Sequence, residues 1–216
     1  MTVNNSFRHS GRFIKRLAVI LSMSLLSAFA QAQSPDSGPN SVIDSAVDEI
    51  AVQIAGRKND LAADTDSLYA MIDGILLPRF DKRYAAQLVL GKHWRTASDE
   101  QKADFIAAFY QSLLRKYADG ILEFDENKIS VLPYRGDETK SRTVVKTEVR
   151  LEDGTKVPVH YGLVKRDAGW LIFDVIIEGI SYVRNFRVEL NSEIQSSSLD
   201  AVIRRLQREA EGADSV

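Results

Sequence analysis

Trp170-Leu171-Ile172-Phe173-Asp174-Val175-Ile176-Ile177-Glu178-Gly179-Ile180-Ser181-Tyr182-Val183-Arg184-Asn185-Phe186-Arg187 is the stretch that decides the fold. Its first half is rich in β-branched and aromatic residues and is apolar on both faces except at Asp174, which predicts a strand covered on both sides. Glu178-Gly179 ends this run, and apolar residues then recur every three to four positions, as on one face of a helix. The apolar positions of this predicted helix are Ile180, Val183, Phe186, Leu190 and Ile194.

Three segments before this strand alternate apolar and polar residues with a period of two, which is the pattern of half-buried strands. We predict strands over residues 128–134, 141–151 and 155–166, and Asp153-Gly154 is typical of the hairpin turn between the last two. Together with the strand that begins at Trp170, these segments predict a four-stranded antiparallel meander.

Helical periodicity dominates the chain on both sides of the predicted sheet. Upstream helices are expected to begin near Ser41, Asp64, Phe80 and Asp99, and Ser98 with Gln101 has the spacing of a capping box for the last of them. This last helix has the widest apolar face, formed by Phe105, Ile106, Phe109, Tyr110, Leu113, Leu114 and Tyr117. With the predicted helices over 180–194 and 199–209, the pattern indicates an α+β fold in which about six to seven helices wrap a twisted antiparallel sheet.

The amino-terminal segment has the pattern of an export signal. Basic residues between Arg8 and Arg16 precede a short apolar region, and Ala28-Phe29-Ala30 or Ala30-Gln31-Ala32 would suit a signal peptidase. We therefore predict a signal peptide over residues 1–30 that is cleaved near 30–32. The alternative is an uncleaved membrane anchor.

The rest of the chain is predicted to be one exported domain over 41–209, between a disordered leader over 31–40 and a flexible tail over 210–216. Without its signal peptide the chain would carry 24 basic and 30 acidic residues, a formal charge of −6. This balance argues against nucleic-acid binding and against electrostatic adhesion to an anionic membrane. Because the sequence has no cysteine, disulfides and thiolate chemistry are excluded, and the core must stabilise the domain.

Patterns of catalytic or metal-binding residues are scarce. His93 and His160 are the only histidines outside the predicted signal peptide, and neither has a partner at metal-ligand spacing. Ser181 is not in the Gly-x-Ser-x-Gly motif of hydrolases. Asp174 and Glu178 could form a carboxylate pair, or could simply accept hydrogen bonds where the strand meets the helix. We expect no metal and no cofactor.

Apolar and aromatic faces are the prominent feature of the sequence. Either these faces pack against one another completely, or they leave a cavity between the helices and the sheet. The sequence pattern alone does not distinguish these two alternatives. Such a cavity would suit an acyl chain better than a sugar or a nucleotide. The residues that we expect around the acyl chains are Phe105, Phe109, Leu113, Val145, Val149, Val159, Tyr161, Phe173, Val175, Tyr182 and Phe186.

Two long motifs resemble the MlaC, or toluene-tolerance, family. The first is Leu90 to Gln101 (Leu-Gly-Lys-His-Trp-Arg-Thr-Ala-Ser-Asp-Glu-Gln), which continues through Phe105 and Ala108-Phe109-Tyr110. The second is Asp174-Val175-Ile176-Ile177-Glu178-Gly179-Ile180-Ser181 with Asn185-Phe186-Arg187, and Leu76 to Asp81 also fits. The similarity extends from about Val42 to Leu206.

The resemblance implies a periplasmic phospholipid-binding protein of the Gram-negative envelope, with helices and sheet around an apolar lipid cavity and no enzymatic activity. It implies that the protein carries phospholipid, within the lipid-asymmetry (Mla) pathway, between an outer-membrane lipoprotein–porin complex and an inner-membrane ABC transporter with an MCE-domain subunit. We expect a monomer without strong headgroup selection. Arg184 and Arg187, just past the strand–helix corner, could meet a lipid phosphate or merely face solvent.

Two other functions stay open on the sequence alone. One is an enzyme on a cone-shaped α+β scaffold, with Asp174 or a buried tyrosine as the acid–base group for an apolar substrate. The other is a periplasmic chaperone or scaffold with a filled core.

Overall fold

The stretch that begins at Trp170 forms β4 (Gly169–Ile177), the fourth strand of a five-stranded antiparallel sheet whose strands lie in sequence order. The other strands are β1 (Ile129–Val131), β2 (Arg142–Arg150), β3 (Lys156–Arg166) and β5 (Ile180–Ser181). The predicted α+β class is confirmed, whereas the predicted number of strands was one too few. Glu178 and Gly179 have φ values of 51° and 82°, so they form a two-residue hairpin turn, and β5 pairs back on β4 before the helix begins.

The part of the chain that the structure describes, residues 38–123 and 125–212, contains eight α-helices besides this sheet. Their bounds are α1 (Pro39–Ile54), α2 (Lys58–Ala63), α3 (Thr65–Leu76), α4 (Lys82–Leu90), α5 (Asp99–Tyr117), α6 (Asp119–Leu122), α7 (Tyr182–Ser196) and α8 (Leu199–Glu211). Short 3-10 helices cover η1 (Leu77–Arg79), η2 (Gly91–Arg95) and η3 (Glu126–Lys128). The count exceeds the predicted six to seven because α2 and α6 are too short to show a periodic pattern.

The described residues all belong to one unit, Asp36–Val216. The predicted signal peptide, most of the predicted leader and the end of the predicted tail lie outside them, so these assignments stay predictions. None of the helices in residues 38–123 and 125–212 is long and apolar enough to cross a membrane.

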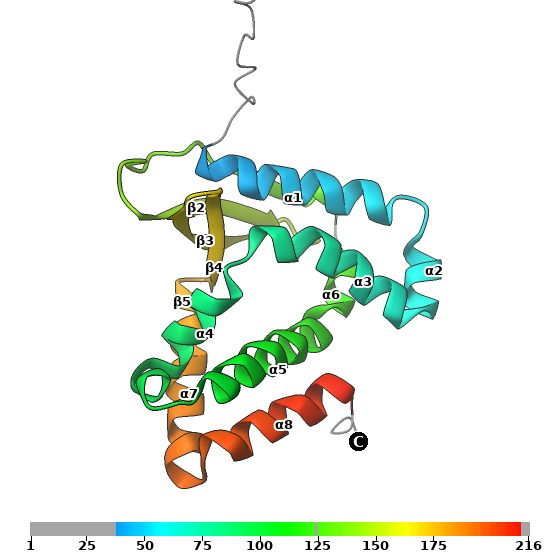
Figure 1. The fold of residues 1–216 in the computed structure, drawn as a ribbon. Coiled ribbons are helices and arrows are strands. Elements are labelled where there is room, and N and C mark those ends of the chain that lie inside the picture. Colours follow the sequence, from blue (N-terminus) through cyan, green and yellow to red (C-terminus); the bar gives the residue numbers. More distant parts are fainter. Residues whose placement is uncertain (1–37, 124, 213–216) are drawn as a thin grey trace, which may run out of the picture. The chain divides into compact units, whose positions relative to one another are not determined.

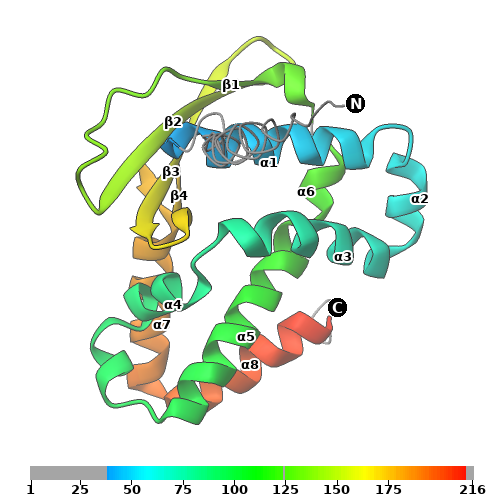
Figure 2. The same cartoon turned by 45° about the horizontal axis from the view of Figure 1, so that its top comes forward.

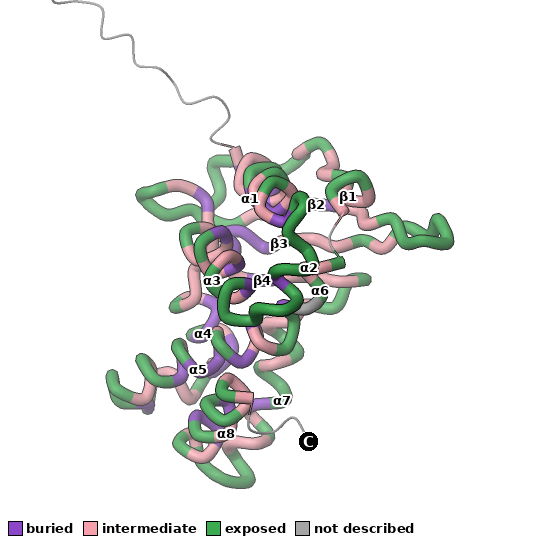
Figure 3. Tube along the Cα trace, turned by 90° about the vertical axis from the view of Figure 1, so that its right-hand side faces the viewer, coloured by how far each residue is buried: buried purple, intermediate pink, exposed green. Residues whose placement is uncertain are grey.

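Helix α1 covers part of one face of the sheet (Figures 1 and 2). Ile43 of α1 is buried against Val145 of β2, Leu163 of β3 and the β4 residues Trp170 and Ile172. These strand residues point to the same face because they are neighbours or near neighbours in the pairing register of β2, β3 and β4. Figure 3 shows buried positions on these strands and also along α5.

The carboxyl-terminal helices form a second core with α4 and α5. Phe105 of α5 and Val202 of α8 are both fully buried there, and Leu190 of α7 packs into the same cluster. Figure 1 shows α5 and α8 running side by side below α4. The predicted capping box of α5 is confirmed, because the Ser98 side chain accepts from Gln101 N and the Gln101 side chain accepts from Ser98 N, both over 3.0 Å.

A buried carboxylate fixes the corner between the sheet and α7. Asp174 accepts a hydrogen bond from Ser181 Oγ over 2.6 Å and another from the backbone N–H of Val183 over 3.0 Å. Ser181 Oγ in turn accepts from Arg184 N and so caps α7. Since only 7% of Asp174 is exposed, the helix N-terminus and these donors compensate for burial of its charge.

Gly91 marks the sharp end of α4 and lies against a side chain of α7. Its φ of 54° and ψ of −113° are accessible to glycine but strained for other residues. An added Cβ would come within 2.7 Å of Nε and Nη2 of Arg187. The Arg187 guanidinium therefore packs directly over the C-terminus of α4, where a positive charge is favourable.

Gly91→Ala is expected to lower the free energy of unfolding by about 1–3 kcal/mol, because alanine is strained in this conformation. Adding Arg187→Ala should restore little of the loss, since a flexible arginine can move away while the backbone strain remains. Gly74→Ala is the matched control, because a Cβ at this position of α3 would meet open space. It should raise stability by up to about 1 kcal/mol. Urea unfolding measures all three variants, and a neutral Gly91→Ala would contradict the assigned strain.

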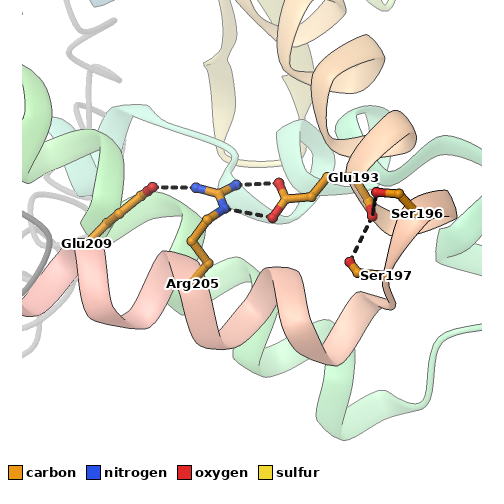
Figure 4. A network of polar contacts seen from close by, with 5 residues as sticks. All are labelled: Glu193, Ser196, Ser197, Arg205 and Glu209. Carbon is orange, nitrogen blue, oxygen red and sulfur yellow. Dashed lines mark hydrogen bonds and ion pairs between the residues drawn. The ribbon is translucent and has the colours of Figure 1, made fainter.

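A bidentate ion pair ties α7 to α8 (Figure 4). Arg205 donates from Nε and Nη2 to the two carboxylate oxygens of Glu193 over 2.8 and 2.7 Å, and it also contacts Glu209. Ser196 and Ser197 both donate to the backbone carbonyl of Glu193, so the end of α7 is held at the same place. The carboxylates beside Arg205 raise the pKa of its guanidinium, which stays charged.

A double-mutant cycle of Arg205→Ala with Glu193→Ala should give a coupling energy of about 1 kcal/mol, because both side chains are partly shielded and the pair is bidentate. The control pair Lys102 and Asp99 should couple much more weakly, since the Asp99 side chain is fully exposed. Equal coupling energies in the two cycles, from urea unfolding, would contradict the role given to Arg205.

Candidate lipid cavity

An apolar cavity of about 390 Å³ lies where α3, α5 and α7 approach β4. Eighteen residues line it, and Asp174 is the only charged residue among them. The lining comprises Ile72, Leu76, Phe80, Ala85, Phe109, Tyr110, Leu113, Leu114, Tyr117, Ala118, Ile121, Phe173, Asp174, Val175, Ile177, Tyr182, Val183 and Phe186. Because the Asp174 carboxylate is bonded to Ser181 and Val183 at the corner, the cavity offers a nearly uniform hydrocarbon surface.

Six of the eleven side chains predicted around the acyl chains belong to this lining. They are Phe109, Leu113, Phe173, Val175, Tyr182 and Phe186. The strand and helix patterns both contribute, since β4 supplies two of the six and the helices α5 and α7 supply the others. Phe173 occupies a β-bulge, where the pairing register with β3 shifts between Gly162 and Leu163.

The other five predicted side chains lie outside the lining. Phe105 is fully buried in the core between α4, α5, α7 and α8, and Val145 is fully buried beneath α1. Tyr161 packs against the cluster beneath α1, and burial raises the pKa of its hydroxyl. Val149 and Val159 are half-buried on the same sheet face, farther toward the ends of β2 and β3.

Aromatic rings connect the interior of the cavity to its rim. Phe109 and Phe186 meet edge to face with ring centroids 5.3 Å apart, and Phe186 lies 6.1 Å from Tyr182. Tyr182 in turn lies 6.1 Å from Tyr117, which is 44% exposed. The lining therefore reaches the surface at the Tyr117 ring, between the end of α5 and the start of α7.

One polar contact on the cavity wall joins two helices. Tyr110 of α5 donates from its hydroxyl to Asp73 of α3 over 2.7 Å, and Lys82 Nζ lies 4.8 Å from the centre of the tyrosine ring. Burial, and then the hydrogen bond to Asp73, raise the pKa of Tyr110, so the hydroxyl keeps its proton. Sequence reasoning missed this pair because Asp73 and Tyr110 are far apart in the chain and Tyr110 was read only as part of an apolar face.

The two carboxylates considered for acid–base chemistry, Asp174 and Glu178, lie at the strand–helix corner and at the hairpin turn. Asp174, proposed above as a possible acid–base group, is occupied by two donors at the strand–helix corner. Glu178 lies at the exposed hairpin turn and does not belong to the cavity lining. In residues 38–123 and 125–212 no three acidic or histidine side chains gather as metal ligands would.

Comparisons with known proteins identify relatives over most of the chain. The toluene tolerance protein ttg2D of Pseudomonas putida is 27% identical over 177 residues, which is 82% of each chain. The intermembrane phospholipid transport system binding protein MlaC of Haemophilus influenzae is 20% identical over 202 residues, 91% of this chain and 94% of its own.

A solved structure shares the fold. The phospholipid-binding protein from Ralstonia solanacearum, determined in complex with a phospholipid, superposes with a TM-score of 0.72 at 21% identity. The match covers 80% of this chain and 97% of that protein. The sequence model of the MlaC protein family matches residues 44–208, so the resemblance is confirmed and the chain belongs to this family.

Proposed function

We propose that this protein is a periplasmic phospholipid carrier that shields acyl chains in its apolar cavity. The cavity carries the proposal, because seventeen of its eighteen lining residues are uncharged and the eighteenth, Asp174, is bonded at the corner. Family membership and the lipid-bound relative support it. By the same likeness, the carrier would move lipid between an outer-membrane lipoprotein–porin complex and an inner-membrane ABC transporter with an MCE-domain subunit.

The energetics of lipid transfer explain why such a cavity is needed. A two-chain lipid exposes about 30 methylenes in water, at about 0.8 kcal/mol each, so moving it unshielded costs on the order of 20 kcal/mol. A carrier that covers the tails removes most of this cost. It needs no catalytic group and no fixed code for the headgroup, which agrees with the hydrocarbon lining.

The size of the cavity indicates that loading changes its shape. At about 390 Å³ it is at the lower end of ligand pockets, whereas the tails of a two-chain lipid need a volume near the upper end, about 1,000 Å³. We infer that lipid entry separates α3 and α5 from β4 and α7. The Tyr110–Asp73 bond would then move α3 and α5 as one body.

Protein expressed with export to the periplasm should contain phospholipid after purification in mild conditions. Solvent extraction followed by mass spectrometry should find close to one two-chain lipid or more per protein, with headgroups in proportion to the host membrane. Protein that is free of lipid, and that takes up none from vesicles, would contradict the proposed function and favour a chaperone with a filled core.

Substitutions of two valines that are aligned on the same sheet face can distinguish the cavity lining from the packed core. Val175→Trp should lower the lipid bound per protein, because the indole would occupy cavity space, and should cost little stability in delipidated protein. Val145→Trp is the matched control, since Val145 is fully buried beneath α1. It should lower the free energy of unfolding by about 1–3 kcal/mol or more through overpacking. Full lipid occupancy in Val175→Trp, measured by extraction beside urea midpoints, would place the chains elsewhere.

A further inference from the structure

A second hollow of about 360 Å³ adjoins the apolar cavity. It lies among α5, α7 and α8, which Figure 1 shows grouped at the end of the domain away from the sheet. The two spaces share the side chains of Phe109, Leu113 and Phe186, so only this apolar partition separates them. The two spaces therefore adjoin each other along α5 and α7.

The walls of this hollow are charged, unlike those of the cavity. Arg115, Lys116 and Arg205 line it together with Glu189 and Glu209. The lining of the hollow thus combines apolar side chains with cations and carboxylates. This is the composition that the polar end of an amphiphile requires.

Two of the three cations have no carboxylate partner in the described part of the chain. Arg205 is held by Glu193 and Glu209, whereas none of the ion pairs among residues 38–123 and 125–212 includes Arg115 or Lys116. Arg115 instead packs beside Gly212 at the C-terminus of α8. Among the described residues, the side chains of Arg115 and Lys116 contact the rings of Tyr69 and Tyr117 but make no hydrogen bond.

Lys116 also connects the hollow to the rim of the cavity. Its Nζ lies 5.7 Å from the centre of the Tyr117 ring, and Tyr117 is part of the cavity lining. Burial, and then the neighbouring Tyr182 and Glu189, raise the pKa of Tyr117. Lys116 therefore lies both at the hollow and beside the rim of the cavity.

We propose that the hollow among α5, α7 and α8 binds the phosphate-bearing head of a phospholipid whose acyl chains occupy the cavity, with Arg115 and Lys116 on the phosphate. This assignment rests on the proposed carrier function. Arginine and lysine both donate strong charge-assisted hydrogen bonds to phosphate oxygens. Glu189 leaves a carboxylate for the amine of a zwitterionic head, so the site requires a phosphate without selecting one headgroup.

The arginines that the sequence placed at the mouth are less suited to this role. Arg184 and Arg187 are both exposed and belong to the lining of neither space. Arg187 packs over Gly91 on the other side of α7. The cations that face the cavity mouth come from α5 instead.

The test compares two lipids that differ only in the phosphoglycerol head. Delipidated protein is titrated with phosphatidylglycerol and with diacylglycerol of the same acyl chains, both presented from cyclodextrin, and the dissociation constants are compared. Arg115→Gln/Lys116→Gln should bind phosphatidylglycerol about tenfold more weakly and diacylglycerol unchanged. The charge-conserving Arg115→Lys/Lys116→Arg should keep most of the affinity for phosphatidylglycerol, and urea midpoints confirm that both variants fold.

Arg95→Gln/Arg184→Gln is the control, because it removes two positive charges outside both linings and should leave both affinities unchanged. An equal loss in this control, or an equal loss for the two lipids, would overturn the headgroup site while the carrier function stands. So would inorganic phosphate or glycerol 3-phosphate binding as tightly as the lipid, which would make the hollow a site for free phosphate. Wild-type protein that binds neither lipid would contradict the carrier function itself, and the headgroup site with it.

Discussion

The buried carboxylate of Asp174 is the interaction on which the arrangement of this fold depends. It lies at the end of β4 and accepts hydrogen bonds from Ser181 and from the first turn of α7. Because a buried charge is tolerated only where donors surround it, this contact sets the position of α7 against the sheet. The direction of α7 then determines where Phe186 and Tyr182 lie, and these two residues form part of one wall of the cavity.

The parts of the domain on either side of this corner differ in how closely their side chains are packed. Beneath α1, and around Phe105 and Val202 where α5 meets α8, side chains are buried in packed clusters, and these clusters supply stability in a chain that has no cysteine. Between them, where α3 and α5 face β4, apolar side chains leave space. A domain can keep such an unfilled, expandable region only if its other cores are well packed, since a cavity forfeits contact energy.

Much of this could be predicted from the sequence, because the signals were local. The change of period at Glu178-Gly179 marked the strand-to-helix corner, and Ser98 with Gln101 marked the start of α5. The strand β5 was missed because two residues carry no periodic pattern, and Ile180, assigned to the helical face, is instead an exposed strand residue.

The division between cavity and core could not be predicted. Val145, Tyr161 and Val175 are aligned across β2, β3 and β4 and share one face of the sheet. Alternation identifies that face, but only the tertiary position of α1 decides that Val145 is covered by a helix while Val175 faces the cavity. Tertiary position also divides the wide apolar face of α5, where Phe105 lies in a packed core and Leu113 lies in the cavity wall.

Photo-crosslinking from an acyl chain tests the central claim most directly. A phospholipid with a diazirine near the end of one chain is loaded into the protein, irradiated, and the labelled residues are mapped by mass spectrometry. We expect labels on the segments that line the cavity, α5 around Leu113 and β4 around Val175, and none on Val145 or on the exposed face of α8. Labels spread over the surface, or concentrated beneath α1, would contradict the account of a carrier with an interior lipid site.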